Sequence, residues 1–139
     1  MIRRIALMSV HASPLVNLGS GKAGGMNVYV REVAREFGRQ GIAVDIYTAG
    51  LKGVSKVDLS LGERISVIYI PVDMDGFVDP IEFYPFLSRF VDGVVASAVK
   101  FNAAYDLIYS HYWLSGWVAN KLREVWGHDN VTLESCNRL

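Results

Sequence analysis

The feature that most constrains the fold of this chain is an alternation of short apolar runs with helical patterns. The run IRRIALMSV near the N-terminus is typical of a buried strand in a parallel sheet. From Met26 to Gln40 the period changes, because apolar residues now recur at the spacing of one helix face. That stripe consists of Val30, Val33, Ala34 and Phe37, and Gly41 follows where a helix-terminating glycine belongs.

The alternation continues to the end of the chain. Further strands are predicted at residues 42–49, 64–72, 105–111 and 130–135, and further helices at residues 81–101, in two pieces around Pro85, and 114–126. Such alternation requires crossover connections, so we predict an α/β fold, a Rossmann-like parallel sheet with helices on both faces. No helix follows the last predicted strand. We therefore expect a truncated chain or one half of a two-domain protein, with part of the sheet bare.

Length and composition exclude several classes of protein. The 139 residues suffice for one domain with a buried core. Their formal net charge is zero, which argues against a nucleic-acid-binding face. Cys136 is the only cysteine and cannot form an internal disulfide, so a reducing, cytoplasmic location is expected. No run approaches the roughly 20 apolar residues of a membrane span, so we expect no integral membrane segment.

The segment GSGKAGGMNVYV, residues 19–30, places two adjacent glycines directly before the first predicted helix. Because Gly24 and Gly25 lack side chains, a ligand can approach the free N–H groups of the helix start, which attract anions. The pattern therefore predicts an anionic ligand at this position. A loop whose glycines only form turns is the simpler alternative, and it stays open at this point.

A dinucleotide site is a third interpretation, since Gly19, Gly21 and Gly24 fit the pattern G-x-G-x-x-G. In that fingerprint the first glycine follows the strand at once, whereas here about nine residues separate Ser9 from Gly19. Asp45 has roughly the right position for the acidic partner, but the predicted strand continues beyond it. A P-loop is excluded because neither Ser nor Thr follows the lysine of this segment.

A second motif, SHYWLSGW at residues 110–117, follows the strand predicted at 105–111. His111, Tyr112 and Trp113 should therefore lie at the same carboxyl edge of the sheet as the glycine loop, and His11 could join them there. Aromatic residues at a strand exit often cap a core, and a histidine there is often only a hydrogen-bonded loop residue; both alternatives stay open. No Cys and His cluster has the spacing of a metal site.

With both motifs in place, the sequence resembles the N-terminal domain of family 4 retaining glycosyltransferases of the two-Rossmann-domain (GT-B) fold. The segments that carry the resemblance are HASPL…GSGKAGGMNVYVRE, REFGRQGIAVDIYT and YDLIYSHYWLSGWVA. The two motifs stand in the expected order about 85 residues apart, and the similarity spans most of residues 3–126. They are most like those of the subgroup of sucrose-phosphate-synthase-like and mycothiol-pathway enzymes.

The resemblance implies that residues 1–139 form an incomplete N-terminal, acceptor-side domain whose donor-binding C-terminal domain is absent. It implies transfer of a sugar from a nucleotide-sugar, usually a UDP-sugar, to a small sugar or sugar-phosphate acceptor, with retention of the anomeric configuration. The nucleotide-sugar is a co-substrate, and neither a cofactor nor a metal is expected.

The resemblance also assigns residues. In such enzymes the glycine loop meets the donor diphosphate, which maps onto Gly24 and Gly25. His111 matches a residue near the acceptor and is expected to be catalytic. The other residues expected in the donor–acceptor cleft are Asn27, His11 and Tyr112.

One departure from the family concerns the last strand. There the family carries a segment close to T-x-H-T-L, whereas this chain reads NVTLESCNRL, in which no histidine follows Thr132. We therefore expect the fragment alone to be inactive. A non-catalytic phosphate- or nucleotide-binding module, or an inactive remnant, is the second hypothesis, and an NAD-dependent oxidoreductase is the third. The bare sheet face also predicts a homo-oligomer.

Overall fold

The computed structural model describes residues 2–10, 25–50, 56–72, 83–127 and 131–135. These residues build a six-stranded sheet with the strand order β3-β4-β2-β1-β5-β6. The strands are β1 (Arg4–Met8), β2 (Ala43–Gly50), β3 (Lys56–Asp58), β4 (Ile65–Pro71), β5 (Leu107–His111) and β6 (Val131–Ser135). Neighbouring strands pair in parallel apart from β3, which runs antiparallel to β4.

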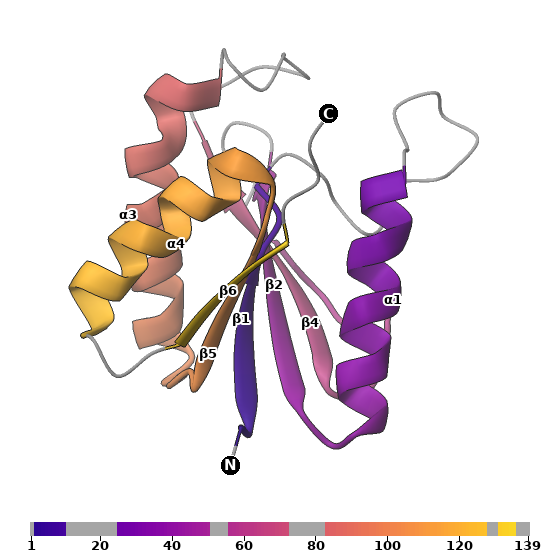
Figure 1. The fold of residues 1–139 in the computed structure, drawn as a ribbon. Coiled ribbons are helices and arrows are strands. Elements are labelled where there is room, and N and C mark those ends of the chain that lie inside the picture. Colours follow the sequence, from indigo (N-terminus) through magenta and orange to yellow (C-terminus); the bar gives the residue numbers. More distant parts are fainter. Residues whose placement is uncertain (1, 11–24, 51–55, 73–82, 128–130, 136–139) are drawn as a thin grey trace.

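Helices cover both faces of this sheet (Figure 1). Helix α1 (Gly25–Arg39) lies on one face, and α3 (Leu87–Lys100) and α4 (Tyr112–Trp126) lie on the other. The core under α1 consists of Leu7, Val30, Ala34, Val44, Ile46, Ile65 and Val67. The larger core under α3 and α4 includes Met8, Tyr47, Ile70, Phe90, Leu114 and Leu122. The predicted Rossmann-like sheet with helices on both faces is therefore confirmed.

Helix α1 forms where the sequence places it, and the predicted stripe faces the core, with Val33 and Phe37 partly buried. Val30 and Ala34 are fully buried, and burial of a side chain such as Val30 contributes roughly 1.5–3 kcal/mol. The helix ends in a Schellman motif, in which the N–H of Ile42 donates to the carbonyl of Phe37 at 3.0 Å. Gly41 has a φ of 84°, the left-handed conformation that this motif requires and that glycine adopts without strain.

The segment predicted as a helix at 81–101 is divided as Pro85 suggests. A short 3-10 turn, η2 (Tyr84–Phe86), precedes α3. Gly93 lets α3 approach β4 closely, because a Cβ atom there would lie 2.3 Å from Cγ2 of Ile70. In α4, Leu114, Val118 and Leu122 are fully buried and Trp126 packs against the core, whereas Val125 is 57% exposed.

A buried polar network joins β1 and β2 near their amino ends. Arg4 donates from Nε and Nη2 to Oδ2 of Asp45 at 2.9 and 2.6 Å, and the Tyr105 hydroxyl donates to the same oxygen at 2.6 Å. The hydroxyls of Tyr105 and Tyr47 lie 2.5 Å apart. Burial raises the pKa of Tyr47 to about 12, and that of Tyr105 also rises. The charge of Asp45 is thus paired and hydrogen-bonded, five positions before Gly50 and away from the strand end where a dinucleotide would bind.

The sheet differs from the prediction at one edge. We expected five parallel strands, and β3 adds an antiparallel strand next to β4. Its three residues are too few to show an alternating pattern in the sequence, and its antiparallel pairing needs only a short connection to β4. None of the helices within the described ranges has the length and apolar character of a membrane span.

Candidate functional site at the switch point of the sheet

The strand order reverses between β1 and β5. From β1 the chain proceeds outward to β2 and β4, and later returns to β5 and β6 on the other side of β1. In open parallel sheets, ligands bind beyond the carboxyl ends of the strands at such a switch point. Here that point lies beyond Met8 and Ser110, which are partners in the β1–β5 register, at the upper edge of the sheet in Figure 1.

The chain leaves β1 along a fixed path. The N–H of Ser9 donates to the carbonyl of Tyr47 at 3.0 Å, and the carbonyl of Val10 accepts from the N–H of Ala49 at 2.9 Å. The N–H of Val10 donates to Oγ of Ser115 in the first turn of α4 at 3.1 Å. Val10 is therefore held between β2 and α4 at the switch point. His11, the next residue, lies outside the described residues, as does Gly24.

Helix α1 begins at this same edge with Gly25 (Figure 1). Gly25 and Asn27 both belong to its first turn, where backbone N–H groups have no partner within the helix. The first turn contains no acidic residue, so no carboxylate there competes for these groups. The side chain of Asn27 lies outside what the structure describes. The helix that begins at Gly25 thus starts at the carboxyl edge of the sheet.

His111 is the last residue of β5 and the N-cap of α4, with a φ of −119° and a ψ of 131°. Its ring makes no capping hydrogen bond, although N-cap side chains usually accept one from the helix. The residue is fully buried, and neither ring nitrogen has a hydrogen-bond partner within the described part of the chain. A buried, unpartnered donor and acceptor at a ligand-binding edge suits hydrogen bonding to a substrate.

Burial lowers the pKa of His111 to about 4, because the surrounding protein disfavours the charged imidazolium. The imidazole is therefore neutral near pH 7, with one nitrogen that donates a hydrogen bond and one that accepts. Tyr109, two positions earlier on the same face of β5, has its phenol pKa raised to about 12, first by burial and then by Tyr29. Both groups beside the switch point are uncharged near neutral pH.

Tyr29 of α1 brings the two sequence motifs together. Its ring packs edge-on against the ring of His111, with centroids 5.1 Å apart and an interplanar angle of 81°. Tyr29 follows Gly25 by four positions, which corresponds to about 6 Å along the helix axis. The imidazole thus contacts the second turn of α1. Tyr112 is the first residue of α4, directly after His111, and its side chain lies outside the described part.

Sequence reasoning missed both tyrosines. Tyr109 could have been found from strand periodicity, because residues two apart on a strand share a face and His111 was already a candidate. Tyr29 precedes the buried Val30 in α1, and no pattern in the sequence marks it as a contact of β5. Across the described ranges, no group of three or more His, Cys, Asp or Glu residues is placed to hold a metal ion.

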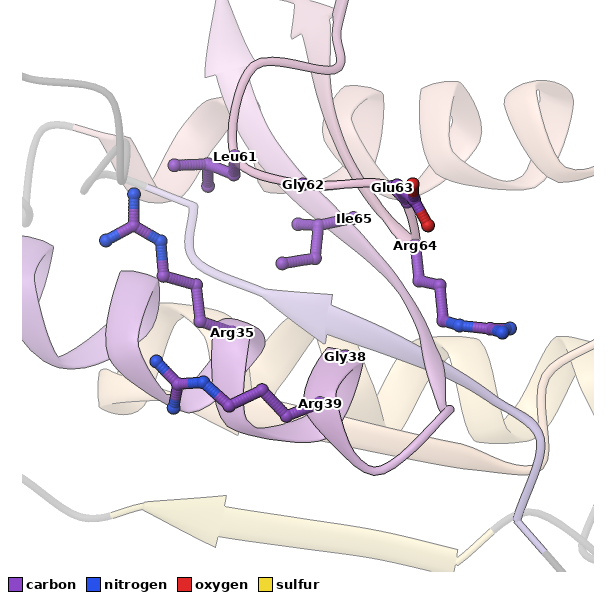
Figure 2. A pocket seen from close by; sticks show the side chains of 8 residues that line it. All are labelled: Arg35, Gly38, Arg39, Leu61, Gly62, Glu63, Arg64 and Ile65. Carbon is purple, nitrogen blue, oxygen red and sulfur yellow. The ribbon is translucent and has the colours of Figure 1, made fainter.

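Two other hollows lie away from this edge. One, of about 320 Å³, lies between the end of α1 and the turn before β4, and Figure 2 shows Arg35 and Arg39 from α1 beside it. These arginines pair with Glu32 at 3.4 Å and Glu36 at 2.8 Å. The other, of about 460 Å³, lies between α3 and the strands β3 and β4. Neither is lined by a residue that the motifs predicted.

Residues 24–129, more than half of the chain, match the sequence model of a family described as glycosyl transferase 4-like domain. The chain belongs to the glycosyl transferase 4-like family. The match covers Gly24, Gly25, Asn27, His111 and Tyr112, while His11 precedes it.

Curated relatives of this glycosyl transferase 4-like domain are about three times longer. The chain is 42% identical over 126 residues to D-inositol 3-phosphate glycosyltransferase of Corynebacterium diphtheriae. The aligned residues cover 91% of this chain and 30% of the relative. A protein of the same name from Thermobifida fusca is 39% identical over 125 residues, with 89% and 29% covered. The chain therefore spans about 30% of the length of the relatives that it matches.

Solved structures of GT-B glycosyltransferases share the fold. Sucrose-phosphate synthase of Thermosynechococcus elongatus superposes with a TM-score of 0.80 at 28% identity, covering 99% of this chain and 33% of that one. The catalytic domain of starch synthase IV from Arabidopsis thaliana gives a TM-score of 0.68 at 13% identity, a likeness of fold alone. The family and the GT-B fold that the two motifs indicated are thereby confirmed.

Proposed function

We propose that this glycosyl transferase 4-like domain is the acceptor-side half of a retaining glycosyltransferase. It takes part in moving a sugar from a UDP-sugar to a small sugar or sugar-phosphate acceptor in the cytoplasm. Residues 1–139 form its N-terminal Rossmann-like domain, and a second such domain supplies the remaining donor contacts. The observation that carries the proposal is the contact of His111 with Tyr29, which joins the SHYW motif to the second turn of α1, the helix that begins at Gly25.

Two relatives support a phosphorylated acceptor. The name of one gives D-inositol 3-phosphate, and that of the other is sucrose-phosphate synthase. In the proposal, Tyr112, His11 and Asn27 face the cleft between donor and acceptor. Asn27 is in the first turn of α1, Tyr112 is the first residue of α4, and His11 follows Val10 in the sequence.

The donor diphosphate lies against Gly24 and Gly25 in this proposal. When the bond between the anomeric carbon and the diphosphate oxygen breaks, negative charge grows on the departing diphosphate. Backbone N–H groups at a helix start stabilise such charge without reorganising. Together with basic side chains of the partner domain, they neutralise the phosphates, so no metal ion and no cofactor are required.

His111 acts on the acceptor. The N–H of its neutral imidazole donates a hydrogen bond to the oxygen of the acceptor hydroxyl and aims this oxygen at the anomeric carbon, so the hydroxyl proton is left facing the diphosphate. The new bond from this oxygen to the anomeric carbon forms on the face from which the diphosphate leaves, and the acceptor proton passes to the diphosphate. The configuration at the anomeric carbon is thereby retained.

The test is an assay of the longest native form of the protein with UDP-sugars and sugar phosphates. We expect UDP release that depends on an acceptor, and ¹H NMR of the product should show the anomeric configuration of the donor. An inverted product would remove the retaining mechanism. Absence of both turnover and UDP binding would remove the proposed function.

A non-catalytic phosphate- or nucleotide-binding module is the second candidate. It is favoured by β6, where no histidine follows Thr132 although the family segment carries one. This candidate predicts that UDP binds to the longest native form and that no acceptor leads to sugar transfer. Acceptor-dependent turnover of any UDP-sugar would exclude it.

A further inference from the structure

To bind an acceptor, the imidazole of His111 must be held in one orientation, and hydrogen bonds from the described part of the chain do not hold it. Within the described ranges neither Nδ1 nor Nε2 has a hydrogen-bond partner, and the side chain is fully buried. A histidine that must present one nitrogen to a substrate is usually oriented by a hydrogen bond at the other. Packing has to supply that orientation here.

Two aromatic rings supply this packing. Tyr29 meets the imidazole edge-on at a centroid distance of 5.1 Å, and Tyr109 lies against it at 4.7 Å with an interplanar angle of 39°. The edge-on arrangement is one that aromatic pairs prefer, since a positive ring edge faces a negative ring face. The two rings contact the imidazole from different elements, α1 and β5.

The two tyrosines are also joined to each other. Their hydroxyl oxygens lie 3.3 Å apart, so one hydroxyl donates a hydrogen bond to the other. Tyr29 remains 41% exposed, which places it at the border between His111 and solvent. Phe37, two turns further along α1, packs edge-on against Tyr109 at 6.1 Å. Phe37 therefore shares one neighbour with Tyr29.

We infer that Tyr29 is a positioning residue, which holds the His111 imidazole in the orientation that meets the acceptor. The inference rests on the proposed function for its catalytic consequence. The ring of Tyr29 performs this role through its edge contact, and its hydroxyl reinforces the role by tying the ring to Tyr109. Because Tyr29 belongs to α1, the same contact joins the imidazole to the helix that begins at Gly25.

The test compares three variants of the longest native form. Tyr29→Leu removes the ring, and we expect its kcat to fall by about two- to tenfold, the range that an aromatic pair supplies, with the KM for the donor unchanged. Tyr29→Phe keeps the ring and should restore kcat to within about twofold of wild type. Phe37→Leu makes the same kind of change on the same helix and should leave kcat unchanged.

Two further measurements separate positioning from a general effect on the fold. In a His111→Phe background, Tyr29→Leu should have no further effect on kcat, because the residue through which it acts is gone. In NMR spectra, contacts between ring protons of His111 and Tyr109 should be kept in Tyr29→Phe and lost or averaged in Tyr29→Leu. This second measurement needs no activity.

The outcomes distinguish the two proposals. If the wild type transfers no sugar, the proposed function fails, and the NMR contacts alone decide the role of Tyr29. The inference is overturned if Tyr29→Leu leaves the His111–Tyr109 contacts as in wild type. It is equally overturned if Tyr29→Leu and Phe37→Leu lower kcat by the same factor, or if the loss appears only in the KM for the donor.

Discussion

Replacing His111 by Phe should remove a specific part of the acid sensitivity of the fold. The wild-type imidazole is fully buried, and burial lowers its pKa to about 4 from an ordinary value of 6.5. Phe keeps an aromatic ring beside Tyr29 and Tyr109 and cannot bind a proton. The two proteins should therefore differ in how the free energy of unfolding changes with pH.

The sign follows from the direction of the pKa change. Because the folded state disfavours the imidazolium, the unfolded chain binds the proton first as pH falls below 6.5. The contribution of His111 to stability is complete above that pH and is lost progressively toward pH 4. With a pKa of 6.5 in the unfolded chain and about 4 in the folded protein, protonation of His111 lowers the free energy of unfolding by about 3 kcal/mol at pH 4. At pH 5 the free energy of unfolding is already lowered by about 2 kcal/mol.

Equilibrium urea unfolding of both proteins, followed by tryptophan fluorescence at about pH 7.5 and about pH 5, measures this difference. Wild type should lose about 2 kcal/mol more than His111→Phe between the two pH values. Other groups cancel in the comparison; Asp106, whose pKa is lowered by the N–H groups of Arg3 and Arg4, titrates in both proteins. Equal losses would refute the account of His111 as a buried, neutral side chain.

Three further predictions concern packing, the polar network and the phosphates. Gly93→Ala should lower the free energy of unfolding in urea by about 1–3 kcal/mol, because the new Cβ would lie 2.3 Å from Ile70. The loss should shrink in an Ile70→Ala background; an equal loss there would show that this clash is not its cause. Tyr105→Phe removes the hydroxyl that donates to Asp45 and should cost about 1.5–3 kcal/mol, whereas an unchanged unfolding curve would contradict the network. Sugar transfer should survive EDTA, and a loss restored by a divalent cation would show that a metal is required.

The arrangement of the sheet followed from the sequence because its pattern is strong and local. The stripe from Val30 to Phe37, the glycine at position 41 and the break at Pro85 each correspond to a feature of the structure. Strand β3 did not, since three residues carry no period. Such features are set by tertiary packing and not by the local sequence.

The site was predictable to the extent that topology fixes it. A parallel sheet puts the exits of β1 and β5 at one edge, so the meeting of the glycine segment with His111 could be expected from the sequence. The contact of Tyr29 with His111 could not, because it depends on how α1 is placed and rotated over the sheet. The same holds for the low pKa of His111, which reflects how completely its neighbours cover the ring.

The most direct test of the central claim, that the β1–β5 edge with His111 is where sugar transfer takes place, is the kcat of His111→Phe in the longest native form. We expect kcat with a UDP-sugar and a sugar phosphate to fall by about a hundredfold, because the acceptor oxygen is no longer aimed at the anomeric carbon, with UDP binding retained. Arg39→Ala, at the hollow of Figure 2, is the control and should keep wild-type kcat. Wild-type kcat in His111→Phe would contradict the account.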